Sequence, residues 1–175
     1  MLTPVVIHPF DKIPPGLAEA VRSAIHERFK IHATVGKSLA VPAAAYSPER
    51  KQYRSTFLLN MLAIIEPGDK KTRLGMVSVD LYVPELNFVF GEASKSERIA
   101  VFSTARLDPR LYGEPADQDL LERRAVTEAI HELGHAFGLE HCSRTDCVMW
   151  FSNTLSESDR KGSQFCSRCS RLLGY

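Results

Sequence analysis

Two histidines and a glutamate occur in the pattern His131-Glu132-Leu133-Gly134-His135. Residues four apart lie on one face of an α-helix, so both imidazoles can contact one metal ion. Glu132 lies about 100° around the helix from His131, where a carboxylate can reach a water on the ion without binding the ion itself. The pattern therefore predicts a zinc site in which Glu132 is the general base that acts on a zinc-activated water.

A third metal ligand is predicted just beyond the helix. Gly138 can adopt the left-handed conformation that ends a helix, and His141 can then return toward the ion. Three neutral imidazoles leave one coordination position open, as hydrolytic zinc requires. We therefore expect His131, His135 and His141 to bind a catalytic zinc. The alternative is a helix whose histidines are exposed or hydrogen-bonded.

All four cysteines lie in the last third of the chain, as Cys142, Cys147, Cys166 and Cys169. Four residues separate the first pair, two separate the second pair, and eighteen residues join the pairs. This spacing is typical of a closed tetrahedral zinc site, which is structural because it leaves no position for water. We expect two Zn²⁺ per chain. Two disulfides are the alternative if the chain is exported.

The combined pattern resembles one family. Three histidines run directly into C-x₄-C-x-M, which contains Met149, and then into C-x₂-C. This arrangement is similar to the archaemetzincin (archaelysin) family of metzincin zinc metallopeptidases. The resemblance covers residues 131–169, and sixteen residues separate Met149 from the last cysteine pair where the family pattern has seventeen.

The resemblance implies a metzincin-like fold and a set of roles. Residues His131, His135 and His141 would bind the catalytic zinc, with Glu132 as base and Met149 beneath the metal. The four cysteines would bind a second, structural zinc. A methionine of the ordinary core is the alternative for Met149.

Hydrophobic periodicity predicts the elements that position these groups. An active-site helix is expected from about Asp117 to Gly138. Two earlier helices are expected, one opened by Pro14-Pro15 and ending near Phe29, and one starting at Ser47-Pro48-Glu49 and stopped by Pro67-Gly68. Strands are expected at residues 5–8, 31–35, 74–83, 87–90 and 99–102.

These elements predict a single catalytic domain over residues 1–175, of α/β (α+β) class, with a mixed twisted sheet and packing helices. Residues 1–138 would form the sheet and helices, including the active-site helix, and residues 139–175 a small zinc-stapled subdomain. Few apolar residues follow Cys142, so a metal must hold that tail together. His141 and Cys142 are adjacent, so we expect the two zinc sites to be mechanically coupled.

Composition excludes several classes of protein. The 175 residues are 44% hydrophobic, enough for one packed core, and the formal net charge is +1. That charge argues against a nucleic-acid partner. The longest nearly apolar run, residues 57–65, is too short to cross a bilayer, and the first residues do not resemble a signal peptide. A cytoplasmic protein with no membrane partner is expected.

The leading hypothesis is a zinc metallopeptidase that acts on peptide or protein substrates. A non-catalytic zinc-binding module that contacts protein or nucleic acid is the second hypothesis. A metzincin scaffold that binds peptides but hydrolyses them poorly is the third. Tyr112 and Tyr175 are candidates for the transition-state electrophile only because they lie near the motif in sequence. Gly134 is explained either by a close approach of strand or substrate, or by packing against the sheet.

Overall fold

The computed structural model describes residues 2–65 and 70–175, and its centre is a five-stranded sheet of order β2-β1-β5-β8-β7. The first four strands of that order are parallel, and β7 is antiparallel to β8 at the edge. The strands of this sheet are β1 (Val5–Pro9), β2 (Ala33–Val35), β5 (Thr72–Val77), β7 (Gly91–Ser94) and β8 (Ile99–Ser103). The expected mixed sheet is confirmed.

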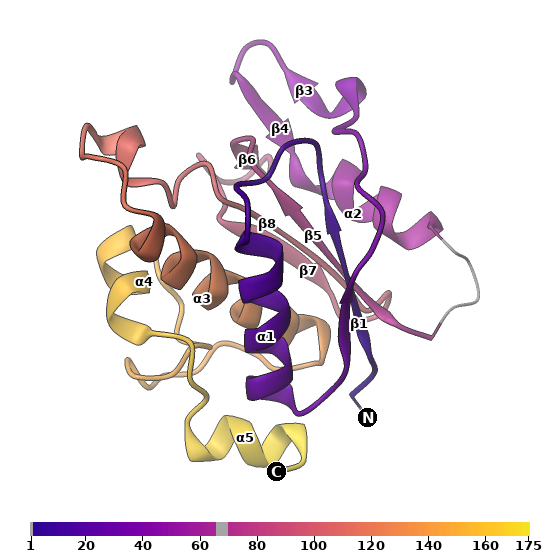
Figure 1. Ribbon diagram of the computed structural model, residues 1–175, viewed down its shortest axis with the longest axis vertical. Coiled ribbons are helices and arrows are strands. Elements are labelled where there is room, and N and C mark those ends of the chain that lie inside the picture. The colour runs from indigo at the N-terminus through magenta and orange to yellow at the C-terminus, as the bar shows by residue number, and fades with distance from the viewer. Residues whose placement is uncertain (1, 66–69) are drawn as a thin grey trace.

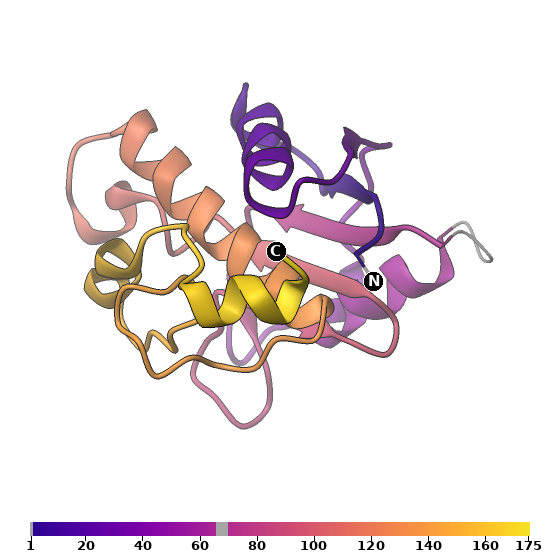
Figure 2. The ribbon, with the colours of Figure 1, turned by 90° about the horizontal axis from the view of Figure 1, so that it is seen from below.

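Helices cover both faces of this sheet. Its central strands β5 and β8 are buried along their whole length, as parallel strands require. Helices α1 and α3 lie on one face and α2 on the other (Figures 1 and 2). The α-helices are α1 (Leu17–Phe29), α2 (Ser55–Ile64), α3 (Gln118–Ala136), α4 (Leu155–Lys161) and α5 (Ser167–Leu173). No helix in the described part of the chain combines the length and apolar character needed to cross a membrane.

The hydrophobic core has two parts, one on each face of the sheet. The larger part joins α1, α3 and the segment around the cysteines, and the smaller part lies under α2. Phe29 of α1 makes edge contacts with Phe137 and with Phe165. The tail after Cys142 therefore contributes apolar side chains to the main core, more than its composition predicts.

A small second sheet corrects the prediction of a helix starting at Ser47. Strands β3 (Tyr46–Ser47) and β4 (Gln52–Arg54) form an antiparallel hairpin, and β4 pairs with β6 (Leu81–Tyr82). Residues 48–51 form its turn, in which Lys51 has a φ of +56° and donates to Ser47 O. Helix α2 begins only at Ser55. The expected stop at Pro67-Gly68 lies outside the described residues.

Other boundaries also differ from the prediction. The expected strand 74–83 is divided into β5 and β6, and the expected strand 87–90 is a loop with only an isolated bridge from Val89 to Leu81. Strand β7 instead occupies part of the polar segment after residue 90. Helix α1 begins at Leu17, after Gly16 with a φ of +81°, rather than at Pro14. Short 3₁₀ turns cover Ala43–Ala45 and Pro109–Tyr112.

The active-site helix has nearly its predicted bounds. Asp117 caps α3 by accepting a hydrogen bond from Leu120 N, and the helix ends at Ala136 before Gly138, which has a φ of +99°. The tail then forms two short helices, and in α4 Thr154 and Glu157 make a complete capping box. Figure 1 shows α4 beside α3 and α5 at the lower end of the molecule, below α1.

Candidate metal centres

The structure brings together the three predicted histidines. His131 and His135 project from one face of α3, and His141 returns to them after the helix ends. His135 Nε2 lies 3.2 Å from His131 Nε2 and 3.2 Å from His141 Nε2. Zn–N distances of about 2.0–2.1 Å place two tetrahedral ligands about 3.3–3.4 Å apart. The spacing of these nitrogens therefore fits a shared zinc ion.

Hydrogen bonds orient two of the imidazole rings. His131 Nδ1 lies 2.7 Å from Val148 O, and His135 Nδ1 lies 2.8 Å from Leu139 O. A carbonyl oxygen only accepts, so Nδ1 carries the proton in both rings, and in the neutral rings both Nε2 atoms present lone pairs. Two lone pairs facing each other at 3.2 Å repel unless a cation lies between them. The donor set therefore fits a metal.

Burial keeps the histidines in the neutral form that binds metals. It holds the pKa of His131 well below its usual range, and the nearby Lys161 ammonium acts in the same direction. Burial also lowers the pKa of His135 and of His141. A neutral imidazole can bind a metal without first losing a proton.

Glu132 projects from α3 against strand β7. The residue is 6% exposed and lines the cleft beside the histidines. Burial raises its pKa well above the usual range, and the carboxylate of Glu128 adds to the shift. Gly91 of β7 faces it closely, since a Cβ there would lie 2.6 Å from Glu132 Cγ and 2.6 Å from Val101 O. The carboxylate is close to the strand only because position 91 has no side chain.

Met149 explains the glycine inside the helix. Its side chain is fully buried, and a Cβ at Gly134 would overlap Met149 Sδ. The close neighbour of Gly134 is thus the thioether, rather than a strand or substrate. Met149 lies against the helix that carries His131 and His135, which agrees with its predicted place beneath the metal.

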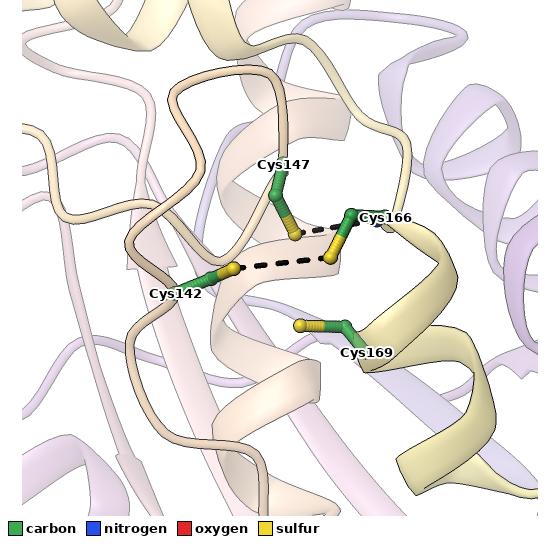
Figure 3. Close-up of side chains that lie close together, drawn as sticks. All are labelled: Cys142, Cys147, Cys166 and Cys169. Carbon is green, nitrogen blue, oxygen red and sulfur yellow. Dashed lines mark hydrogen bonds between the residues drawn. The ribbon is translucent and has the colours of Figure 1, made fainter.

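The four cysteines form a second cluster, and their sulfurs point toward a common centre (Figure 3). Cys142 and Cys147 lie on the loop after α3, and Cys166 and Cys169 lie at the start of α5. All four sulfurs lie within 4.8 Å of one another, and Cys142 Sγ is 3.8 Å from Cys166 Sγ. Zn–S bonds of about 2.3 Å give about 3.8 Å between tetrahedral ligands. The cluster fits a closed zinc site.

The thiols of this cluster differ in acidity. Burial raises the pKa of Cys169 and of Cys147. Burial opposes ionisation of Cys166 too, but hydrogen bonds from the Cys169 backbone and from the neighbouring thiols lower its pKa to about 7. The lowered pKa makes Cys166 readier than Cys147 or Cys169 to form the thiolate that a metal binds.

The two clusters share one stretch of backbone. His141 and Cys142 are consecutive residues that face different clusters. Cys142 N donates to Met149 O at 2.8 Å, and Cys142 bridges to Trp150. The segment that carries the third histidine is therefore hydrogen-bonded to the segment that carries Met149.

A cleft of about 450 Å³ opens over the histidines. One wall is the loop before β7, and the other is the segment after Met149, where the Phe151 ring lies 4.8 Å from the His141 ring. Side chains from β4 and from the segment after β8 contact the loop before β7. Gln52 Nε2 donates to Asn87 O, and the Arg106 guanidinium lies over Phe88 and pairs with Asp80. Neither Tyr112 nor Tyr175 lines this cleft.

Three acidic or basic residues of the cleft were absent from the sequence prediction. Glu128 shares the helix face of His131 and His135, so periodicity could have identified it. Glu92 on β7 accepts hydrogen bonds from Ser55 and Thr56. Lys161 reaches the cleft from α4, and no local pattern marks it among the polar residues of the tail.

Comparisons with known proteins agree with this geometry. The family model described as Peptidase family M54 matches residues 12–174. A curated relative, the archaemetzincin of Pyrococcus abyssi, is 37% identical, and the match covers 99% of this chain and 95% of the relative. The archaemetzincin of Methanopyrus kandleri is 46% identical, over 86% of this chain and 87% of the relative.

Solved structures share the fold. The crystal structure of the Methanopyrus kandleri archaemetzincin superposes with a TM-score of 0.87 at 40% identity, over 98% of this chain and 93% of that one. A structure described as a zinc-dependent peptidase from Methanocorpusculum labreanum has a TM-score of 0.89 at 29% identity, over 97% of this chain and all of the other.

Proposed function

The chain belongs to peptidase family M54, the family of the archaemetzincins, and on that premise we propose that it hydrolyses peptide bonds with Glu132 as general base. We also propose that His131, His135 and His141 bind the catalytic zinc. The observation that carries the proposal is the pair of imidazoles whose unprotonated Nε2 atoms lie 3.2 Å apart. A second, structural zinc is proposed on the four cysteines.

The proposed chemistry follows from where these residues lie. A zinc ion on the three imidazoles would polarise the carbonyl of the substrate and lower the pKa of a water molecule. Glu132 takes the proton that the attacking water loses, and it later gives that proton to the leaving amine. Because burial raises its pKa, the Glu132 carboxylate holds a proton more firmly than an exposed one.

Replacing the base tests this function. Glu132→Gln keeps the shape of the side chain but cannot accept the proton, so cleavage of a peptide library should fall by about 10²- to 10⁴-fold. Cleavage sites and rates are followed by mass spectrometry, and zinc by elemental analysis. The zinc content should equal that of the wild type, because Glu132 is not a ligand.

Glu140→Gln is the matched control, since Glu140 is exposed, adjacent to His141 and outside the cleft lining. It should cleave at the wild-type rate. A zinc-loaded Glu132→Gln variant that cleaves as fast as this control would refute the assigned base.

A further inference from the structure

A buried ion pair lies next to the histidine cluster, where α4 packs against α3. Glu128 and Lys161 are 2% and 4% exposed, and Lys161 Nζ lies 3.7 Å from Glu128 Oε1. Ser158 Oγ donates a hydrogen bond of 2.5 Å to the same carboxylate oxygen. Moving two charges out of water is costly, and apolar side chains of similar volume often stabilise a fold equally well. Stability alone therefore does not explain this pair.

The other contacts of the Lys161 ammonium lead to the metal site. Lys161 Nζ donates to Trp150 O at 3.3 Å, and it lies 3.3 Å from His131 Nδ1. His131 Nδ1 donates its hydrogen bond to Val148 O and therefore accepts none from Lys161. The Lys161 ammonium protons are directed instead to the Trp150 carbonyl and to the Glu128 carboxylate. Val148 and Trp150 flank Met149. His131 and Lys161 thus hold two carbonyls of one short segment.

Helix α4, which carries Lys161, is docked on α3 by a second ion pair. Arg124 of α3 makes a bidentate pair with Asp159 of α4, with distances of 2.7 and 2.8 Å. No contact of that pair leads to Val148, Trp150 or His131 among the described residues. The two pairs therefore join the same two helices, but only one of them contacts the metal segment.

We propose that Lys161 is a positioning residue for the catalytic zinc. Anchored by Glu128, it holds the Trp150 carbonyl so that the Val148–Trp150 segment stays in register with α3. The Val148 carbonyl then fixes the His131 ring with Nε2 directed at the other two histidines. Outer hydrogen bonds of this kind commonly set metal affinity through ligand orientation. The inference rests on the proposed function, in which these histidines bind zinc.

The test compares two double variants. Lys161→Met with Glu128→Gln removes the contact to Trp150 together with the charge of the Glu128 partner, and Arg124→Met with Asp159→Asn removes the control pair. Zinc affinity at the histidines is measured by competition with a chelator, and the histidine-bound ion is identified as the one missing from a His135→Ala variant. The absorption of Co²⁺ at the same site reports its geometry.

The first double variant should bind the histidine zinc about 10- to 100-fold more weakly and shift the Co²⁺ bands. The control double variant should leave the histidine-site zinc affinity and the Co²⁺ bands unchanged. Both double variants should retain the zinc bound by the cysteines. Wild-type zinc affinity at the histidines of the first double variant overturns the proposal. An equal loss of that affinity in both double variants also overturns it. If wild-type protein binds no zinc at the histidines, the proposed function itself is refuted, and the role of Lys161 with it.

A second comparison applies if the double variant does not fold. Lys161→Arg keeps the charge, but a planar guanidinium cannot occupy the place of a compact ammonium between Trp150 O and Glu128 without moving the segment. We expect the histidine zinc to dissociate several-fold faster from this variant. Arg124→Lys is the reciprocal control and should release zinc at the wild-type rate. A folded Lys161→Arg variant with wild-type release contradicts the proposal.

Discussion

Two glycines, Gly91 and Gly134, shape the candidate site because they have no side chain. Position 91 has no Cβ where Glu132 meets β7, and position 134 has none where Met149 meets α3. Each glycine lets a functional group approach the backbone more closely than any other residue would allow. The Glu132 side chain and the Met149 thioether thus lie on opposite sides of the histidine-bearing helix, each facing a position that has no Cβ.

Gly91→Ala should impair catalysis without affecting metal binding. The added Cβ would lie 2.6 Å from both Glu132 Cγ and Val101 O, and the carbonyl belongs to a strand that is paired on both sides. The contact with Val101 O can be relieved only by a shift of the edge strand β7, and the contact with Glu132 Cγ requires that side chain to move as well. We therefore expect peptide hydrolysis to fall at least about tenfold through misplacement of the base. Zinc content should not change. Ser94→Ala on the same strand is the control, and equal rates in the two variants would show that position 91 does not place Glu132.

The histidine cluster could be predicted because the spacing of its residues is local. A helix turn and one glycine-mediated reversal bring His131, His135 and His141 together, and both steps are visible in the sequence. Glu92 and Lys161 reach the same cleft from a strand and a helix that are distant in the chain. Their contacts depend on tertiary packing, which no short pattern encodes.

At the scale of elements, a local helix-start pattern failed to predict the structure where strand pairing favoured a hairpin instead. Ser47-Pro48-Glu49 resembles a helix start, but the pairing of Tyr46 with Tyr53 and of β4 with β6 places the turn there. The apolar run 74–83 is interrupted because β6 leaves the central sheet for the small one. The long amphipathic helix α3 had no such competitor, and its predicted bounds hold within two residues.

The coupling of the two zinc sites is also a prediction about elements. Helix α5 supplies Cys166 and Cys169, while Cys142 ties the same cluster to His141. Cys169→Ser should therefore loosen α5 and weaken zinc affinity at the histidines about tenfold or more, although Cys169 does not touch that site. Competitive chelator titration measures the affinity.

Ser170→Ala in the same helix is the control for this coupling. The opposing view is that α3 and the turn after it suffice, since Leu139 N donates to Gly134 O and Leu139 O accepts from His135. Unchanged histidine-site affinity in the Cys169→Ser variant would support that view and refute the coupling.

The central sheet precedes every candidate metal ligand, and the tail after α3 contains most of these candidate ligands. All five strands of the central sheet precede His131, and both core clusters include residues of that sheet. The tail joins the core through Phe165 and the cysteines, so its packing and its metal content are linked.

Metal removal should therefore loosen one end of the molecule. Elemental analysis of protein purified without chelator should give two zinc ions per chain. At free zinc a thousand times above Kd, linkage predicts about 4 kcal/mol of stability per site, which is about 10 °C in Tm for a chain of this size. After chelation, amide exchange should accelerate in residues 142–173 and stay slow in β5 and β8. One zinc per chain with four freely alkylated thiols would refute the cysteine site.

The position of the histidine cluster late in the chain also affects the order in which the protein folds during synthesis. Ribosomal synthesis proceeds from the N-terminus, and domains fold as their residues emerge. Every strand of both sheets is made before the first histidine of the cluster, and one sheet face stays partly bare until α3 docks with Leu121, Ala125 and Ala129. Docking of that helix covers the exposed sheet face and presents His131 and His135 in the same event. A nascent chain is thus exposed to aggregation at this stage, but it cannot hydrolyse neighbouring chains before α3 has docked on the sheet.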